Sequence, residues 1–121
     1  MKKRILIIDD NIDLQEIFRI HFEAAGYLVY TSSDWASGVT NLLECKPDII
    51  LLDIMMPGMN GYEFLDTIRN YSSIKIPVVV CSSLSQDADI QKTYELWADG
   101  YIQKSEIDGK GIVKEVSTFL A

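Results

Sequence analysis

Ionisable or hydroxyl side chains follow four of the apolar segments in this sequence. Asp9 and Asp10 come after the first segment, Asp53 after the third, Ser82 after the fourth and Lys104 after the fifth. Together they offer an anionic nucleophile, carboxylates that can hold a cation, a hydroxyl donor and an ammonium, which are the groups that aspartyl-phosphate chemistry requires. That chemistry is possible only if the fold brings these side chains to one place.

The apolar segments themselves have the character of β-strands. Short runs rich in apolar, β-branched and aromatic residues predict strands at 4–9, 27–31, 48–53, 76–82 and 100–104. The segments 48–53 and 76–82 show almost no alternation of polar and apolar residues, which indicates strands that are covered on both faces.

Segments with a helical spacing of apolar residues lie between these strands and after the last one. Apolar residues recur there at intervals of three and four, as in amphipathic helices. The predicted inner faces are Leu14, Ile17, Phe18, Phe22 and Ala25; Trp35, Val39, Leu42 and Leu43; Phe64, Leu65 and Ile68; Ile90, Tyr94 and Trp97; and Ile112, Val113, Val116, Phe119 and Leu120. Strands alternating with helices predict an α/β fold, a parallel sheet with helices on both faces. At 121 residues the chain fits one domain, over 1–121.

Polar residues and glycines predict where the helices begin and end. Gly26 is expected to stop the first helix, and the run 31–33 to start the second. Asn60 can cap the third helix, and Ser105 with Asp108 can form a capping box for the last one.

The carboxyl ends of parallel strands meet at one edge of the sheet, where ligands bind in such folds. If the first and third strands are neighbours, about 4.8 Å apart, Asp9, Asp10 and Asp53 crowd into one pocket. Like charges that close require a proton or a cation among them, and oxygen donors suit Mg²⁺. The alternative is that each Asp caps a separate helix. Lys104 at another strand end favours a shared site.

The overall charge and the length of the apolar runs exclude some classes of function. A net charge of −7 argues against direct binding to nucleic acid or to anionic lipid. The longest strictly apolar runs have four residues, whereas a membrane helix needs about twenty. Cys45 and Cys81 have no partner motif, which indicates free thiols in a reducing compartment. A cytoplasmic location is expected.

Four segments resemble the receiver domain of two-component response regulators, a family of phosphoacceptor signalling switches. They are LIIDDN at 6–11, DIILLDIMMPGMNGYEFL at 48–65, IPVVVCSS at 76–83 and GYIQK at 100–104. The resemblance covers essentially the whole chain and implies a flavodoxin-like fold with strand order 2-1-3-4-5. It also implies a phosphorelay function that starts from a sensor histidine kinase. The family members are switches rather than enzymes, with autophosphorylation and autodephosphorylation as their only activities.

The resemblance assigns a role to each residue of the motif. Asp53 would be phosphorylated, Asp10 would bind Mg²⁺ directly and Asp9 through water, Met55 would give its backbone carbonyl to the metal, Ser82 and Tyr101 would move in the switch, and Lys104 would hold a phosphoryl oxygen. The switch would alter the surface of the fourth helix, fifth strand and fifth helix. A downstream protein target would bind this surface. A homodimer on phosphorylation is a further expectation.

Two features of the sequence are particular to this chain. Ser105 stands where the family commonly has a proline, so we expect a trans peptide after Lys104. Met55 and Leu84 place apolar side chains two residues beyond Asp53 and Ser82, respectively. Because neither side chain offers a base, we expect slow hydrolysis of the phosphorylated form.

Other classes of protein fit the sequence less well. A phosphatase of the haloacid-dehalogenase type needs a second acid two residues after its nucleophile, and this chain has Met55 there. A flavin-binding module needs a phosphate-binding loop after the first strand, where this chain carries the acidic segment 8–14. A receiver-like domain that works without phosphorylation would be indicated by missing acids, and here they are present. His21, far in sequence from every acid of the motif, is expected to be a surface or packing residue.

Overall fold

Strands and helices alternate along the whole chain. The computed structural model describes residues 2–56, 61–70, 75–83 and 87–120. The elements are β1 (Arg4–Ile8), α1 (Ile12–Ala24), β2 (Leu28–Ser32), α2 (Trp35–Cys45), β3 (Ile49–Leu52), α3 (Gly61–Asn70), β4 (Val78–Ser82), α4 (Asp87–Glu95), β5 (Gly100–Gln103), a 3-10 helix η1 (Lys104–Glu106) and α5 (Gly109–Ser117). The predicted alternation of strands and helices is confirmed.

The strands form one parallel sheet in the order β2-β1-β3-β4-β5. β1 lies between β2 and β3, and its last residue, Ile8, is in register with Ser32 on one side and Leu52 on the other. β4 pairs with β3 and with β5. The predicted strand order is confirmed, and it makes the acids that follow β1 and β3 neighbours at the carboxyl edge of the sheet.

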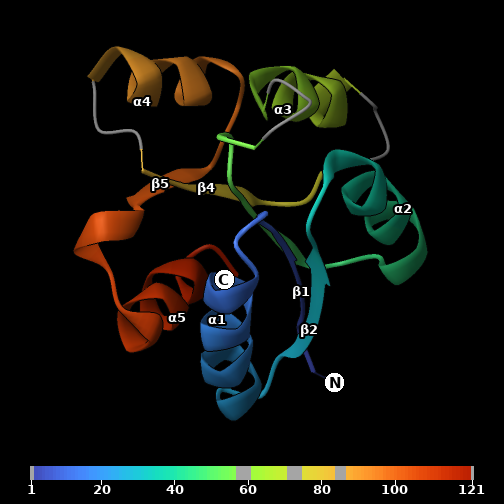
Figure 1. The fold of residues 1–121 in the computed structure, drawn as a ribbon. Helices are drawn as coiled ribbons and strands as arrows, with labels where there is room; N and C mark the ends of the chain where they lie inside the picture. The colour runs from blue at the N-terminus through green and yellow to red at the C-terminus, as the bar shows by residue number, and fades with distance from the viewer. Residues whose placement is uncertain (1, 57–60, 71–74, 84–86, 121) are drawn as a thin grey trace.

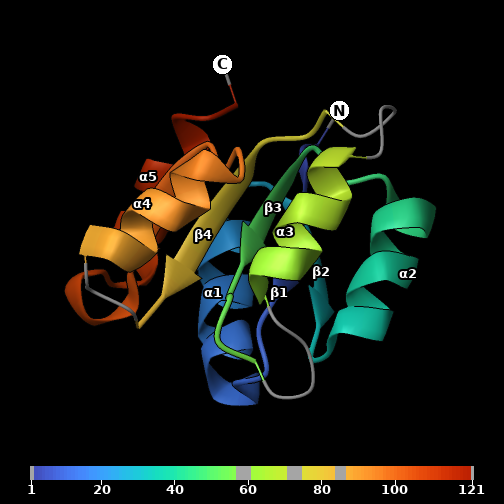
Figure 2. The ribbon, with the colours of Figure 1, turned by 90° about the horizontal axis from the view of Figure 1, so that it is seen from above.

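The helices cover both faces of the sheet. α1 and α5 lie on one face, while α2, α3 and α4 lie on the other (Figure 1). Figure 2 shows α3 and α4 lying over β3 and β4 from a second direction. Alternate residues of β1 serve the two layers: Leu6 and Ile8 pack in the cluster that contains Phe64, and Ile5 and Ile7 in the cluster that contains Phe22.

Every residue of β3 and β4 is buried. Both strands are therefore covered on both faces, as the lack of alternation in 48–53 and 76–82 predicted. This burial leaves only the ends of the strands for polar side chains, which is where the candidate site lies.

The helix starts depend on single capping side chains. Asn11 accepts a hydrogen bond from the Leu14 N–H at 3.0 Å and caps α1. Asp34 caps α2 by accepting the Ser37 N–H at 2.7 Å, so the prediction that 31–33 start this helix was wrong. The run 31–33 ends β2 instead, because its first two residues still belong to the strand.

Asp108 alone caps α5, where it accepts the Gly111 N–H at 2.7 Å. Ser105 lies in η1, so the predicted capping box is wrong. The cap predicted at Asn60 lies outside the described residues.

The predicted inner faces of the helices are partly correct. Phe18 and Phe22 are buried, but Ile17 is 49% exposed and Leu43 is 63% exposed. Trp97 is 75% exposed because α4 ends before it.

α1 and α4 end in the same backbone motif. In each, the residue after the last turn has a positive φ: 95° at Gly26 and 70° at Trp97. Two hydrogen bonds close each turn. At the end of α1 they run from Gly26 N–H to Glu23 C=O and from Tyr27 N–H to Phe22 C=O. At the end of α4 they run from Trp97 N–H to Tyr94 C=O and from Ala98 N–H to Thr93 C=O. Glycine is the residue that usually occupies this left-handed position, so Trp97 is an exception.

A search of the described residues finds no helix with the length and apolar character that a membrane crossing requires.

Candidate functional site

Three aspartates meet at the carboxyl edge of the sheet. Backbone hydrogen bonds continue one residue past the strands, from Asp9 N–H to Ser32 C=O at 3.0 Å and from Asp53 N–H to Ile8 C=O at 2.9 Å. They hold Asp9 and Asp53 side by side, each only 3% exposed, whereas Asp10 is exposed. One carboxylate oxygen from each of the three acids lies within 4.8 Å of the other two.

Lys104 reaches this acidic cluster from the end of β5. Its Nζ lies 2.8 Å from Asp9 Oδ2 and 2.8 Å from Asp53 Oδ2. The other oxygen of each acid accepts a backbone N–H at 2.9 Å, from Asn11 to Asp9 Oδ1 and from Met55 to Asp53 Oδ1. Both buried carboxylates are therefore fixed by one backbone donor and one ammonium.

The charges in the pocket do not balance. Burial raises the pKa of Asp9, although the contact with Lys104 opposes this shift. Burial lowers the pKa of Lys104, but its hydrogen bonds to Asp53 and Asp9 outweigh burial, so the pKa of Lys104 is raised. The lysine therefore stays protonated, and one ammonium faces three carboxylates. This excess of negative charge on oxygen donors suits a hard divalent cation.

Ser82 and Tyr101 lie on neighbouring strands beside the pocket. Ser82 is the last residue of β4 and is fully buried, and Tyr101 on β5 is half-buried. Burial raises the pKa of Tyr101, and a hydrogen bond with the Ser82 side chain opposes that shift. A movement of the Ser82 hydroxyl would therefore change a contact of Tyr101.

The remaining predicted positions are only partly described. Met55 has a 53% exposed side chain, and its N–H is bound to Asp53. Leu84, predicted to exclude water, lies outside the described residues. The peptide after Lys104 is trans, as expected from Ser105. His21 is a packing residue, since its ring lies against Gly109 at the start of α5.

One residue at the site was missed in the sequence. Gln15 on α1 is 4% exposed, and its amide donates to the backbone carbonyl of Asp9. Its spacing from Phe18 and Phe22, three and seven residues, is the signal that it shares the buried face of α1.

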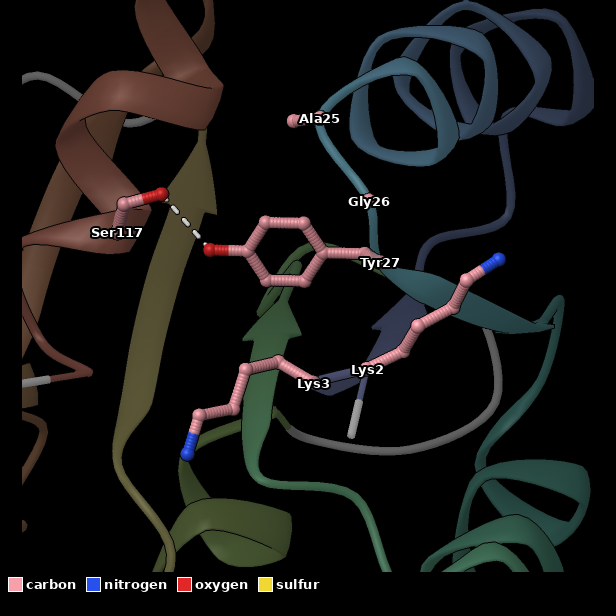
Figure 3. Close-up of a pocket in the computed structure, with 6 residues that line it drawn as sticks. All are labelled: Lys2, Lys3, Ala25, Gly26, Tyr27 and Ser117. Atoms are coloured by element: carbon pink, nitrogen blue, oxygen red, sulfur yellow. Dashed lines mark hydrogen bonds between the residues drawn. The ribbon is translucent and has the colours of Figure 1, made fainter.

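A cavity of about 570 Å³ lies at the opposite end of β1 and β2, lined by Lys2, Lys3, Ala25, Gly26, Tyr27 and Ser117. Figure 3 shows that the Lys2 and Lys3 side chains point away from each other, so their ammonium groups do not converge. Tyr27 Oη and Ser117 Oγ, 2.7 Å apart, bind each other. The cavity holds none of the acids, and we place the functional site at the carboxyl edge.

The fold and the site together define a flavodoxin-like α/β protein with carboxylates and a lysine gathered at the carboxyl edge of its sheet. The chain belongs to the response regulator receiver domain family, which it matches over residues 5–117. It is therefore a receiver domain, the phosphoacceptor switch of two-component signalling, in a family that interacts with histidine kinases.

Curated relatives share this part of their sequence with the chain. The "DNA-binding response regulator MtrA" of Mycolicibacterium paratuberculosis is 34% identical over 104 residues, which are 86% of this chain and 45% of that protein. The "Probable transcriptional regulator ycf27" of Guillardia theta is 34% identical over 103 residues, which are 85% of this chain and 40% of that protein. The chain thus spans less than half the length of these relatives.

Solved structures confirm the fold. The chemotaxis response regulator CheY4 of Vibrio cholerae is similar with a TM-score of 0.90 and 23% identity, over 98% of this chain and 99% of that chain. A CheY-like receiver domain protein from Methanospirillum hungatei is similar with a TM-score of 0.88 and 21% identity, over 98% and 93% of the two chains.

Proposed function

We propose that Asp53 accepts a phosphoryl group from a histidine kinase and thereby switches the surface of the domain. The observation that carries this proposal is the position of Lys104 Nζ, 2.8 Å from both Asp9 and Asp53, beside three carboxylates within 4.8 Å of one another. We also propose that residues 1–121 form one such domain.

The acidic cluster fits Mg²⁺. Asp10 and Asp53 would bind the ion directly, Asp9 through water, and Met55 through its backbone carbonyl. All these donors are oxygen atoms, as Mg²⁺ prefers. When bound, the ion supplies positive charge that offsets the charge of the incoming phosphoryl oxygens.

Asp53 is the nucleophile in this proposal. Its carboxylate attacks the phosphorus atom, an O–P bond forms, and the P–N bond of the phosphohistidine breaks as the imidazole leaves with a proton from solvent. Lys104 is close enough to exchange its contact with Asp53 Oδ2 for a contact with a phosphoryl oxygen. Phosphorylation and its reversal are the only reactions we assign to the domain itself.

Ser82 and Tyr101 would carry the switch outward. The Ser82 hydroxyl would turn toward the phosphoryl group, and the hydrogen bond between Ser82 and Tyr101 couples the tyrosine to that movement. Because Tyr101 lies on β5 and α4 packs next to β5, the change would reach the α4–β5–α5 surface. A downstream protein target would bind there, and phosphorylated copies can pair through it.

The experiment is a mass measurement after incubation with Mg²⁺ and a small acyl phosphate. We expect the wild-type protein to gain the mass of one phosphoryl group and the Asp53→Asn variant to gain none. A Lys104→Met variant should gain it more slowly, by roughly 10-fold or more, because the ammonium that would contact an oxygen of the transferring phosphoryl group is lost. Equal phosphorylation of the wild-type and Asp53→Asn proteins would move the acceptor elsewhere.

The matched relatives include a protein named as DNA-binding, but they are more than twice as long as the matched part. We propose that this chain, with a net charge of −7, does not itself bind nucleic acid or membranes. We further propose that it works in the cytoplasm, where a kinase would phosphorylate it.

A further inference from the structure

Gln15 is a buried polar side chain that the proposed phosphoryl transfer does not use. It lies on the sheet-facing side of α1, 4% exposed, in the same row as Phe18 and Phe22. Its Nε2 donates to the carbonyl of Asp9, to the carbonyl of Ser32 at 3.0 Å and to Ser33 Oγ at 3.3 Å. A buried amide with this many acceptors is fixed in one orientation.

The first of these contacts lies where the regular hydrogen bonding of β1 ends. The Ser32 carbonyl accepts both the Asp9 N–H, at 3.0 Å, and the Gln15 amide. The Asp9 carbonyl is already beyond the strand, and the Gln15 amide is its donor. Gln15 therefore holds the chain between Asp9 and Asp10 at the point where the sheet no longer does.

This peptide determines where Asp10 points. The Asp9 carboxylate is held separately, by Lys104 and by the Asn11 N–H. The Asp10 side chain is exposed, so packing does not hold it. Its position within 4.8 Å of the other two carboxylates then depends on the orientation of the Asp9–Asp10 peptide.

We infer that Gln15 is a positioning residue for the metal site: its buried amide fixes the Asp9–Asp10 peptide so that the Asp10 carboxylate faces Asp53. The inference rests on the proposed function, because it assumes that the acids bind Mg²⁺. Groups that orient ligands from outside the coordination sphere typically change metal affinity by about 10- to 100-fold. Gln15 acts through the backbone, so we expect the lower end of that range.

The test compares two amides that bind the same end of β2. Gln15→Met keeps the length of the side chain and removes its donors. Asn41→Leu is the control, because the Asn41 amide donates to Ser32 Oγ at 2.7 Å and to the Thr31 carbonyl at 3.3 Å, whereas the Gln15 amide donates to the Asp9 carbonyl. Both variants are titrated with Mg²⁺ by calorimetry and by amide NMR, and both are melted without Mg²⁺.

We expect both variants to melt at lower temperature, because each loses the hydrogen bonds that its amide makes to the end of β2. Only Gln15→Met should bind Mg²⁺ more weakly, by about 10-fold, with Asn41→Leu within about twofold of wild type. Gln15→Asn, whose amide is one methylene short, should also bind Mg²⁺ more weakly, and it provides the test if Gln15→Met does not fold. In the NMR spectrum, the weakened variants should show a displaced Asp10 amide signal before Mg²⁺ is added.

Unchanged Mg²⁺ affinity in a folded Gln15→Met or Gln15→Asn protein would overturn the inference, leaving Gln15 as a structural amide only. An equal loss of affinity in Asn41→Leu would also overturn it, because the effect would then follow from stability. If the wild-type protein itself shows no Mg²⁺ binding, or if Asp53→Asn is still phosphorylated, the proposed function fails instead.

Discussion

Asp9, Asp10 and Asp53 share a pocket but lie in different environments. Asp9 and Asp53 are buried, and each is held by Lys104 and by a backbone N–H. Asp10 is exposed and close to both. Since one ammonium serves two buried carboxylates, the charge of Asp10 is the least compensated of the three. The three negative charges repel one another at this distance, and a cation among them would reduce that repulsion.

Removal of this charge should stabilise the protein when no metal is present. We expect Asp10→Asn to raise the free energy of unfolding by about 1 kcal/mol in Mg²⁺-free buffer, because repulsion from two nearby carboxylates is lost. Added Mg²⁺ should stabilise the wild-type protein and have little effect on the variant. Thermal unfolding with and without Mg²⁺ measures both effects.

Asp13→Asn is the control for that experiment. Asp13 is an exposed acid in the first turn of α1, where a negative charge is favourable, so its loss should not stabilise the protein. An Asp10→Asn protein that melts lower than wild type, or that keeps the full response to Mg²⁺, would contradict the charge argument.

The two cysteines should differ in reactivity. Cys81 is buried in β4, and burial raises its pKa to about 12, so almost no thiolate is present at neutral pH. Cys45, on α2, is only partly buried. We expect iodoacetamide to label Cys45 in the native protein and to label Cys81 only after unfolding. Peptide mass spectrometry of native and denatured samples measures this, and equal labelling of both thiols in the native protein would be the contrary result.

At the scale of the secondary-structure elements, α1 and α4 end in the same turn, whose left-handed position is Gly26 in one and Trp97 in the other. Gly26 adopts φ 95° without strain, and a Cβ added there would meet nothing within 4 Å. Trp97 adopts φ 70° with a Cβ, and its side chain gains little from packing because it is 75% exposed. A hydrogen bond of 3.0 Å from Arg69 Nε to the Trp97 carbonyl helps to hold this turn.

Removing the Cβ at position 97 and adding one at position 26 should change stability in opposite directions. We expect Trp97→Gly to stabilise the protein by about 1 kcal/mol, because the left-handed conformation is unfavourable for a residue with a Cβ. Gly26→Ala should destabilise it by a similar amount, about 1 kcal/mol, for the same reason. Urea unfolding of the two variants tests the pair. Destabilisation by Trp97→Gly would show that the packing of the indole outweighs the backbone term.

Strands β1, β3 and β4 could be predicted because a parallel strand covered on both faces is apolar almost throughout, and because runs of four or five such residues are too short for a typical helix. The grouping of Asp9, Asp10, Asp53 and Lys104 could be predicted because each of them lies at or just after the carboxyl end of a strand. The missed features have local causes. Gln15 shares the helical spacing of Phe18 and Phe22, but the pattern was read from apolar residues only, so a polar residue on the same face was passed over. Trp97 continues the spacing of Ile90 and Tyr94, although the helix has already ended at Glu95.

At the scale of the whole molecule, the two ends of the strands carry different groups. The carboxyl edge carries the acids, the lysine and the serine. At the opposite end, Tyr27 binds Ser117 and so joins the start of β2 to the end of α5. Between the two ends, β3 and the first four residues of β4 are apolar and buried. We therefore expect changes at one edge to leave the other unaffected.

Tyr27→Phe tests this separation. The variant loses the hydrogen bond to Ser117 but keeps the ring, which packs edge-on against Phe22 at 5.1 Å. We expect a loss of about 1 kcal/mol in the free energy of unfolding and no change in Mg²⁺ affinity or phosphorylation rate. Ser117→Ala should give the same loss, and the double variant no more than either. A changed Mg²⁺ affinity would mean that the two edges are coupled.

The double contact of Lys104 gives the pocket a counterion that cannot diffuse away. A domain that loses its magnesium between signals would then still hold both buried carboxylates in place, and it would need no refolding to be reloaded. Because the ammonium already contacts one oxygen of Asp9 and one of Asp53, it would compete with a bound ion for these carboxylates and so weaken its binding. Occupancy should thus follow the free magnesium concentration around the protein, so that readiness to receive a phosphoryl group depends on the ionic medium as well as on the kinase.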